Sequence, residues 1–360
     1  KYVDMPVNWC EELGTVLSND EVIDGKSERG GYPVIRKNMK QLCIDQAAFA
    51  ERLLEGLNEI DWPESTKEMQ RNWIGRSTGV EVQFEIVGGG KFSIFTTCIE
   101  TIYGITFMVL APDGDLVQEL MPRIKNQDEV KAYIQETVSK SEMDRTELNK
   151  GKTGCRLEGI KAINPVNGRE VEVFIGDFVL ANYGTGAVMA VPSHDQRDFE
   201  YAIAHNIDMI QVIAGQDVSE HAFEKQDYLG KGCKLINSEE FTGLTVEEAK
   251  VAITKKLVDM GIAKETVNYR FREWIFARQR YWGEPVPIVH LEDGTDYVLP
   301  DEELPLILPE LEDYKGHNGK APLENATEWK QYNKKGVKGV RETSTMPGSA
   351  GSSWYYLRYI

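Results

Sequence analysis

The sequence lacks paired cysteines, which argues against the two commonest cysteine-based scaffolds. Its five cysteines are an odd number, none forms a Cys-x-x-Cys pair, and they stand at positions 10, 43, 98, 155 and 233. A zinc ribbon needs closely spaced thiolate pairs, and a disulfide framework uses an even number of cysteines. We therefore expect no metal site and a reducing compartment, the cytoplasm.

Long apolar runs are also missing. No run approaches the roughly 20 residues that a membrane-spanning helix needs. The opening residues, Lys1-Tyr2-Val3-Asp4, hold neither an initiator methionine nor a signal peptide. These features predict a protein without a membrane partner and a chain that is a piece of something longer.

Positive charge is scarce. The 41 lysines and arginines are outnumbered by 58 aspartates and glutamates, which gives a net charge of −17. This balance argues against general affinity for nucleic acids, because phosphate backbones attract basic surfaces. A nucleic-acid enzyme with this charge would have to concentrate its basic surface in other parts of a larger protein.

Tryptophan is absent from residues 74–273. The flanks hold all seven tryptophans, at positions 9, 62, 73, 274, 282, 329 and 354. This shift in composition predicts a middle domain inserted into a different one. We place the junctions near 73–77 and 269–274, which divides the chain into residues 1–73, 74–270 and 271–360.

Strands outnumber helices in the middle segment. Strict alternation from Val80 to Ile86, three glycines at 88–90 and renewed alternation from Phe92 predict a β-hairpin. Thr245 and Glu248 form a capping-box pattern at the start of a helix that Gly261 ends. We expect an α+β fold with a barrel-like, β-rich middle domain. Further strands are expected at 103–110, 157–163 and 171–180, and helices at 44–59, 127–140, 195–205 and 245–260.

The most informative stretch is residues 182–198, Asn-Tyr-Gly-Thr-Gly-Ala-Val-Met-Ala-Val-Pro-Ser-His-Asp-Gln-Arg-Asp. A glycine-containing turn leads into a short apolar run that ends at Pro192 and delivers Asp195 and Asp198. In the first turn of a helix this spacing puts both carboxylates on one side, where unpaired N–H groups stabilise anions. A fixed anion there can hold an ammonium group; ordinary acidic helix caps are the alternative interpretation.

A second polar stretch, Thr96-Thr97-Cys98-Ile99-Glu100-Thr101, directly follows a predicted strand. Its hydroxyls and carboxylate are suited to lining a polar pocket, and a plain strand end with turn residues is the alternative. The pair His194-Asp195 also fits a metal-dependent phosphohydrolase. That site needs further histidines, however, and the others in the sequence show no ligand spacing.

These stretches resemble leucyl-tRNA synthetases of the bacterial type. Residues 184–198 are similar to the family's editing-site motif, residues 96–101 to its T-T-R-P-D-T, and residues 278–283 to the R-Q-R-Y-W-G of its synthetic core. The resemblance implies an editing domain over 74–270, inserted into parts of a class I, Rossmann-type core. It also implies a zinc-ribbon-like connective segment with a core-flanking helix over 1–73, and a return to the catalytic core with a leucyl-specific insertion over 271–360.

The resemblance further implies catalytic roles. Asp198 would fix the α-amino group of the misattached amino acid with support from Asp195, while Thr96 and Thr97 would orient water or stabilise the oxyanion. Contacts with the synthetic core would come from Arg278, Gln279, Arg280, Tyr281 and Trp282. Cys10 matches the start of the family's zinc-ribbon insertion, but no Cys-x-x-Cys follows where relatives have one, so we expect no zinc.

Substrate binding would involve Met189 and Val191 at the side-chain pocket, Tyr183 and Arg197 on the adenosine side, Thr101 as the specificity threonine, and Cys98. Cys98, Ile99 and Glu100 stand where relatives have arginine, proline and aspartate. A cysteine cannot supply the guanidinium that relatives use to place the terminal adenosine.

The function that the resemblance implies is hydrolysis of mischarged tRNA(Leu), for example isoleucyl- or norvalyl-tRNA(Leu), by a fragment of the synthetase. The full-length parent would join leucine to tRNA(Leu) with ATP and Mg²⁺. The H-I-G-H and K-M-S-K-S signatures do not occur in the sequence, so we expect no cofactor for this chain. The expected partners of a cytoplasmic monomer are the tRNA(Leu) acceptor end and the amino acid ester. An inactive module that binds the acceptor end and a metal-dependent hydrolase remain as alternatives.

Overall fold

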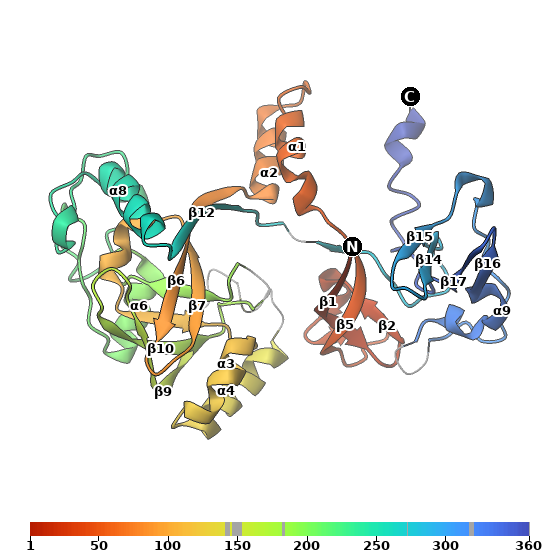
Figure 1. The fold of residues 1–360 in the computed structure, drawn as a ribbon, viewed down its shortest axis with the longest axis horizontal. Coiled ribbons are helices and arrows are strands. Elements are labelled where there is room, and N and C mark those ends of the chain that lie inside the picture. Colours follow the sequence, from red (N-terminus) through yellow and green to blue (C-terminus); the bar gives the residue numbers. More distant parts are fainter. Residues whose placement is uncertain (141–144, 146–152, 182–183, 272, 317–319, 360) are drawn as a thin grey trace. The chain divides into compact units, whose positions relative to one another are not determined.

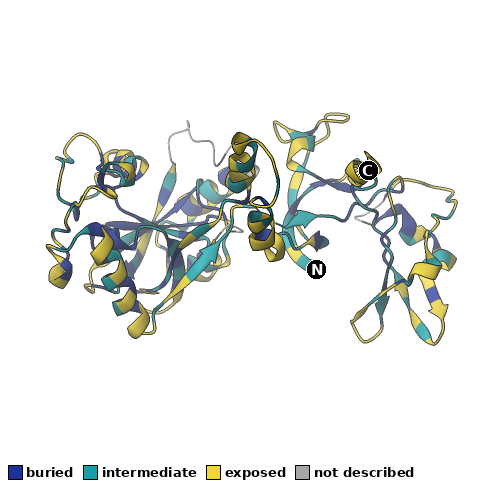
Figure 2. Ribbon diagram, turned by 90° about the horizontal axis from the view of Figure 1, so that it is seen from above, coloured by how far each residue is buried: buried dark blue, intermediate teal, exposed yellow. Residues whose placement is uncertain are grey.

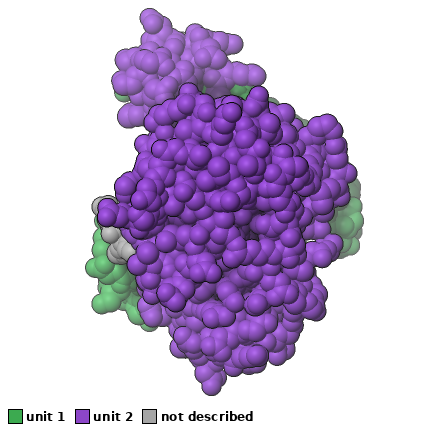
Figure 3. Space-filling model, turned by 90° about the vertical axis from the view of Figure 1, so that its left-hand side faces the viewer, with its two compact units in different colours: residues 1–53, 271–360 green, residues 54–270 purple. Residues whose placement is uncertain are grey.

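The computed structural model describes residues 1–140, 145, 153–181, 184–271, 273–316 and 320–359 (Figure 1). They form two compact units, Lys1–Leu53 with Phe271–Ile360 and Leu54–Arg270, which Figure 3 colours separately. The junction that we infer near 73–77 lies inside the second unit. Helix α2 (Glu64–Ile74) is tied to the end of that unit, because the N–H of Arg270 donates to the carbonyls of Ile74 and Gly75.

The unit Leu54–Arg270 is built on a seven-stranded sheet, in which hydrogen bonding runs in the order β11-β8-β10-β9-β6-β12 and β7 pairs with β6. Strands β8 and β10 are parallel, and the other described pairs of this sheet are antiparallel. The strands are β6 (Ser77–Ile86), β7 (Lys91–Thr96), β8 (Phe107–Leu110), β9 (Gly154–Ile163), β10 (Glu170–Gly176), β11 (Ala187–Ala190) and β12 (Ala263–Asn268).

The expected barrel does not close among the described strands. The path of hydrogen-bonded strands ends at β11 on one side and at β12 on the other. Strand β7 lies beside β11, but the two share no ladder. The structure is therefore a mixed, β-rich fold with an open sheet.

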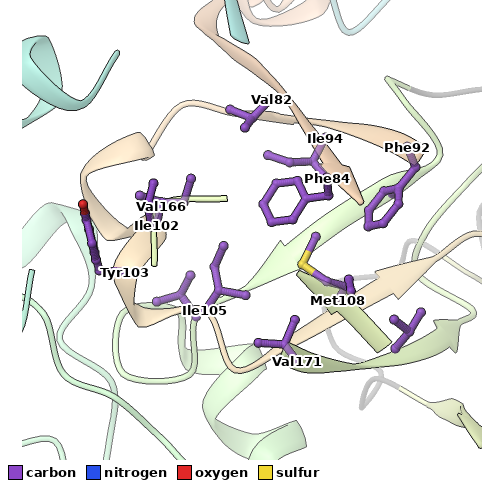
Figure 4. Packing of buried hydrophobic residues seen from close by; sticks show 14 of the residues in the cluster. Val82, Phe84, Phe92, Ile94, Ile102, Tyr103, Ile105, Met108, Val166 and Val171 are labelled. Carbon is purple, nitrogen blue, oxygen red and sulfur yellow. The ribbon is translucent and has the colours of Figure 1, made fainter. Parts of the chain in front are cut away.

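The predicted hairpin is confirmed, and it supplies much of the core. Gly88, Gly89 and Gly90 all have positive φ, which lets the chain turn tightly from β6 into β7. Val82 faces Ile94 in the ladder, and Phe84 stacks on Phe92 with ring centroids 5.7 Å apart (Figure 4). Figure 2 shows buried residues along the strands and exposed ones on the outer faces of the helices.

The helices of this unit are α3 (Asp115–Leu120), α4 (Gln127–Ser139), α6 (Gln196–His205), α7 (Lys225–Tyr228) and α8 (Val246–Asp259). The helices predicted at 127–140, 195–205 and 245–260 are confirmed. The capping box is present as well: the N–H of Thr245 donates to the Glu248 carboxylate at 3.0 Å, and the N–H of Glu248 donates to the Thr245 hydroxyl at 3.3 Å.

Three predicted elements differ from the structure. The strand expected at 103–110 begins only at Phe107, because Ile99–Gly104 form a buried 3-10 helix. The strand expected at 171–180 ends at Gly176. The helix expected at 44–59 is shorter, α1 (Ala50–Gly56) behind a 3-10 turn, and Ile44 instead ends a strand. Leu53, which the pattern places inward, is 49% exposed.

The other unit contains antiparallel sheets. One has the order β13-β5-β1-β2, a second the order β15-β14-β17-β16, and β3 pairs with β4. A Rossmann-type core needs parallel strands, and the described residues of this unit show none, so that expectation is not confirmed. The elements are β1 (Tyr2–Cys10), β2 (Thr15–Leu17), β3 (Val22–Ile23), β4 (Lys26–Ser27), β5 (Ile35–Ile44), β13 (Trp274–Ile275), β14 (Ile288–Leu291), β15 (Asp296–Val298), α9 (Thr327–Lys330), β16 (Gln331–Lys334) and β17 (Val337–Arg341). Within the described part of the chain, no helix has the length and apolar character needed to span a membrane.

Candidate functional site

The aspartate segment, residues 184–198, runs along β11 and turns into α6. Strand β11 pairs with β8, so that Met189 faces Met108. Alternation along the strand puts Met189 and Val191 on the side of the main core, while Val188 and Ala190 pack on a smaller cluster. The two residues predicted to line a side-chain pocket therefore share one face. Tyr183, predicted for the adenosine side, lies outside the described residues.

Both aspartates lie at the start of α6, as predicted, and each has a different backbone partner. Asp195 is the N-cap, and its Oδ1 accepts hydrogen bonds from the N–H groups of Arg197 and Asp198 at 3.0 and 3.1 Å. Asp198 is 8% exposed, and its Oδ2 accepts from the N–H of Val191 at 3.0 Å. The Asp198 carboxylate is thereby fixed to the end of the apolar strand. Arg197 is exposed, with its guanidinium 3.8 Å from Asp195.

His194 is part of the scaffold. Its Nδ1 lies 3.0 Å from the carbonyl of Phe223, and its Nε2 lies 3.0 and 3.2 Å from the N–H groups of Val212 and Ile213. Nε2 must accept these two bonds, so the proton is on Nδ1 and the ring is neutral. Burial lowers the pKa of His194 to about 4. Neither ring nitrogen is left for a metal, and no group of three or more metal-binding side chains is found among the described residues.

The hydroxyl segment, residues 96–101, leaves the end of β7 and enters the buried 3-10 helix. The hydroxyl of Thr96 accepts from the N–H of Cys98 at 3.0 Å, and the buried hydroxyl of Thr101 donates to the carbonyl of Cys98 at 2.8 Å. Two of the predicted hydroxyls therefore help to shape the turn around Cys98. The hydroxyl of Thr97 instead lies 3.5 Å from the ammonium group of Lys225.

Glu100 is fully buried, at 0% exposure, which the sequence does not reveal. Its Oε1 accepts from the hydroxyl of Tyr228 at 3.2 Å, and its Oε2 has no hydrogen-bond partner among the described residues. Burial raises the pKa of Glu100, and burial together with Glu100 raises the pKa of Tyr228. This carboxyl is therefore biased toward its protonated form.

The structure brings the hydroxyl and aspartate segments together. A side chain on Gly104 would lie 3.0 Å from Cγ1 of Val191, so these two backbones are in close approach. The N–H of Thr106 donates to the carbonyl of Ala190 at 3.3 Å. Tyr228 links the segments a second time, since its hydroxyl reaches Glu100 and its ring meets that of His194 edge-on at 6.0 Å.

Sequence reasoning missed three residues of this site, Lys225, Tyr228 and Lys250. Lys225 and Tyr228 belong to the short helix α7, and Lys250 extends from α8 to the carbonyl of Thr97, at 2.9 Å. They are 128 to 153 residues away in sequence from the groups that they contact. No local pattern marks such residues, because only the fold places them.

The residues predicted as synthetic-core contacts lie in the other unit, and most have internal partners. Arg278 is buried and donates to the carbonyls of Ile275 and Ala277. The remaining contacts are from Gln279 to the N–H of Val16, from Arg280 to Glu21, and from the hydroxyl of Tyr281 to the carbonyl of Pro309. Trp282 is 78% exposed. Their role toward a ligand remains a prediction.

Comparison with known proteins gives two matches. Residues 71–258 match the family model described as leucyl-tRNA synthetase, editing domain. The whole chain is also similar to a crystallised ternary complex of the Agrobacterium radiobacter K84 agnB2 LeuRS with tRNA and LeuAMS. The TM-score is 0.72 at 30% sequence identity, and the match covers 100% of this chain and 41% of that one. This chain thus spans less than half the length of that relative.

Proposed function

The chain belongs to the leucyl-tRNA synthetase editing-domain family, and from this premise we propose that residues 54–270 hydrolyse the ester bond of tRNA(Leu) that carries a wrong amino acid. Aliphatic amino acids that differ by one methylene are distinguished in a binding site by only about 1–3 kcal/mol. A second, hydrolytic site compensates for that weak discrimination.

One observation carries the proposal: the hydroxyl segment and the aspartate segment, far apart in sequence, adjoin each other in the fold. Gly104 packs on Val191, and Tyr228 touches both Glu100 and His194. An aminoacyl ester needs both kinds of group, a carboxylate for its ammonium and hydrogen-bond donors for its developing oxyanion.

Asp198 is the group that we assign to the substrate ammonium. Its backbone bond to Val191 and its burial hold the carboxylate in one place, so little ordering is left for the moment of binding. The ester is already activated, and hydrolysis by water needs no protein nucleophile. We assign orientation of that water, or stabilisation of the oxyanion, to Thr96 and Thr97. Asp195 supports Asp198 by fixing the first turn of α6.

The partners in this proposal are the acceptor end of tRNA(Leu) and its amino acid ester. Hydrolysis of the ester requires no cofactor, and we assign ATP and Mg²⁺ to leucine ligation by a longer synthetase. A cytoplasmic monomer is the form that we propose for the chain.

The test is deacylation of isoleucyl-tRNA(Leu) by the purified chain and by Asp198→Asn. Asparagine keeps an oxygen for the N–H of Val191 but loses the charge, so the variant should fold normally. A charge-assisted bond is worth about 1.5–3 kcal/mol, which predicts a loss of roughly ten- to a hundredfold in rate. Glu200→Gln, which removes one exposed charge from the same helix, is the matched control.

Equal rates for wild type and Asp198→Asn would assign the ammonium to another group. Binding of the acceptor end without any hydrolysis by the wild type would instead favour an inactive binding module. The substitutions at Cys98, Ile99 and Glu100 are the observation that makes this second function worth testing.

A further inference from the structure

Two lysines converge on Thr97 at the proposed site. The ammonium group of Lys250, from α8, lies 2.9 Å from the carbonyl oxygen of Thr97. The ammonium group of Lys225, the first residue of α7, lies 3.5 Å from the Thr97 hydroxyl. Both side chains are half-buried. Two positive charges therefore lie within reach of a single residue of the hydroxyl segment.

These charges are not neutralised by neighbouring carboxylates. Among the described residues, neither Lys225 nor Lys250 forms an ion pair, whereas Lys255 and Lys256 of the same helix α8 pair with Asp259 and Glu240. The acidic group that both lysines influence is Glu100, and burial biases that carboxyl toward its neutral form. Unpaired lysines are unexpected in a chain with a net charge of −17.

We propose that Lys225 and Lys250 form a phosphate-binding pair that holds the sugar–phosphate backbone at the 3′ end of the tRNA. This inference rests on the proposed function and deepens it, because it names the groups that hold the nucleic-acid part of the substrate. An ammonium group binds phosphate oxygens as a point charge and needs no fixed planar geometry. The pair supplies positive charge beside Cys98, a position that itself carries no cation.

Charge also determines which part of the substrate each group receives. The aminoacyl end is a cation, which Lys225 and Lys250 repel and Asp198 attracts. The phosphates are anions, for which the preference is reversed. A substrate with an ammonium at one end and phosphates at the other therefore fits in only one orientation, with its ester between Asp198 and the lysine pair.

The experiment measures binding of an uncharged acceptor-stem minihelix of tRNA(Leu) that ends in CCA, as a function of salt. The proteins are the full chain, Lys225→Gln, Lys250→Gln and the double variant, and Lys255→Gln is the control on α8. Each lost phosphate contact in a single strand lowers the slope of log K against log salt by about 0.7. We expect the double variant to lose about 1.4 in slope and at least tenfold in affinity at low salt, with no change for Lys255→Gln.

A rescue experiment makes the assignment specific. Cys98→Arg should restore affinity in the double lysine variant and add little to the wild type, because the new guanidinium would meet the same phosphates. Equal gains in both backgrounds, an unchanged slope in the double variant, or no salt-dependent binding by the wild type would each overturn the proposal. Because the minihelix carries no ester, failure to deacylate counts against the proposed hydrolysis and leaves this binding result intact.

Discussion

At the scale of single residues, the proposed site separates groups that shape it from groups that face a substrate. His194, Asp195, Thr96 and Thr101 use side-chain atoms to fix nearby backbone. Asp198 is both anchored and charged, and Lys225 and Lys250 have no described carboxylate partner. Substitutions in the first set should therefore change stability or shape, and substitutions in the second should change binding or rate.

His194 should make the stability of the chain depend on pH. Its folded pKa of about 4 lies below its ordinary value of 6.5, because burial disfavours the charged ring. Between these two values the unfolded chain binds a proton that the folded chain does not, so stability falls as pH falls. The loss should approach about 3 kcal/mol when pH drops from 7 to 4.

Urea unfolding at several pH values, for wild type and His194→Gln, measures this effect. The variant should be less stable at pH 7, since it loses hydrogen bonds to Val212 and Ile213. Its stability should also change less between pH 6.5 and 4. Parallel pH profiles for the two proteins would show that His194 is charged in the folded state.

Thr101 should protect correctly charged tRNA. It is 2% exposed, and its β-branched side chain is stiff, so a steric wall at this position would reject the γ-branch of leucine. Thr101→Ala should remove the wall and hydrolyse leucyl-tRNA(Leu), while isoleucyl-tRNA(Leu) is still cleared. The measurement is the half-life of leucyl-tRNA(Leu) at equal enzyme concentration.

Thr101→Val is the matched control, because valine keeps the branched shape and loses only the hydroxyl that bonds to Cys98. It should protect leucyl-tRNA(Leu) as wild type does. Hydrolysis by the valine variant would mean that the hydroxyl, through the turn at Cys98, sets specificity. Protection by the alanine variant would move the discriminating wall to Met189 or Val191.

At the scale of elements, the site depends on how short segments meet. The hydroxyl segment joins β7 to β8, the aspartate segment joins β11 to α6, and α7 and α8 bring Tyr228 and both lysines to the same place. Gly104 is the close contact between the first two segments. It has an ordinary φ, so its lack of a side chain, and not backbone strain, is what the packing requires.

Gly104→Ala should therefore destabilise the unit Leu54–Arg270. The added methyl group would lie 3.0 Å from the carbonyl oxygen of Ile210 and from Val191, and 3.1 Å from Val212. Overpacking of this kind costs about 1–3 kcal/mol. Gly56→Ala, at a position with no atom within 4 Å, should be neutral or slightly stabilising. Thermal unfolding compares the two, and equal midpoints would show that the segments can separate without cost.

Local rules explain which elements the sequence predicts. The hairpin follows from alternation and three glycines, α8 from its capping box, and α6 from Asp195. The 3-10 helix Ile99–Gly104 escapes prediction because all its residues are buried, so no periodicity separates it from a strand. Tyr228 and the two lysines escape because their contacts exist only after the chain has folded.

At the scale of the whole molecule, each compact unit has a core of its own. The largest cluster of buried apolar residues lies entirely within Leu54–Arg270 and extends from β6 and β7 to α8. The proposed site draws its described groups from this unit alone. The charge balance of the chain is also uneven at this scale, because a net charge of −17 surrounds an unpaired lysine pair.

The unit Leu54–Arg270 should fold without the rest of the chain. Its ends are joined by the bonds from Arg270 to Ile74 and Gly75, and a side chain on Gly75 would clash with Cβ of Arg270. Excised residues 54–270 should show one cooperative thermal transition and deacylate isoleucyl-tRNA(Leu) at a rate close to that of the full chain. Residues 77–268, which lack α2 and Arg270, are the control and should melt at a lower temperature, because the end of β12 loses its anchor. A piece 54–270 that does not unfold cooperatively, under conditions where the full chain does, would show that its core needs the other unit. A folded piece without hydrolysis, beside an active full chain, would place a necessary group outside residues 54–270.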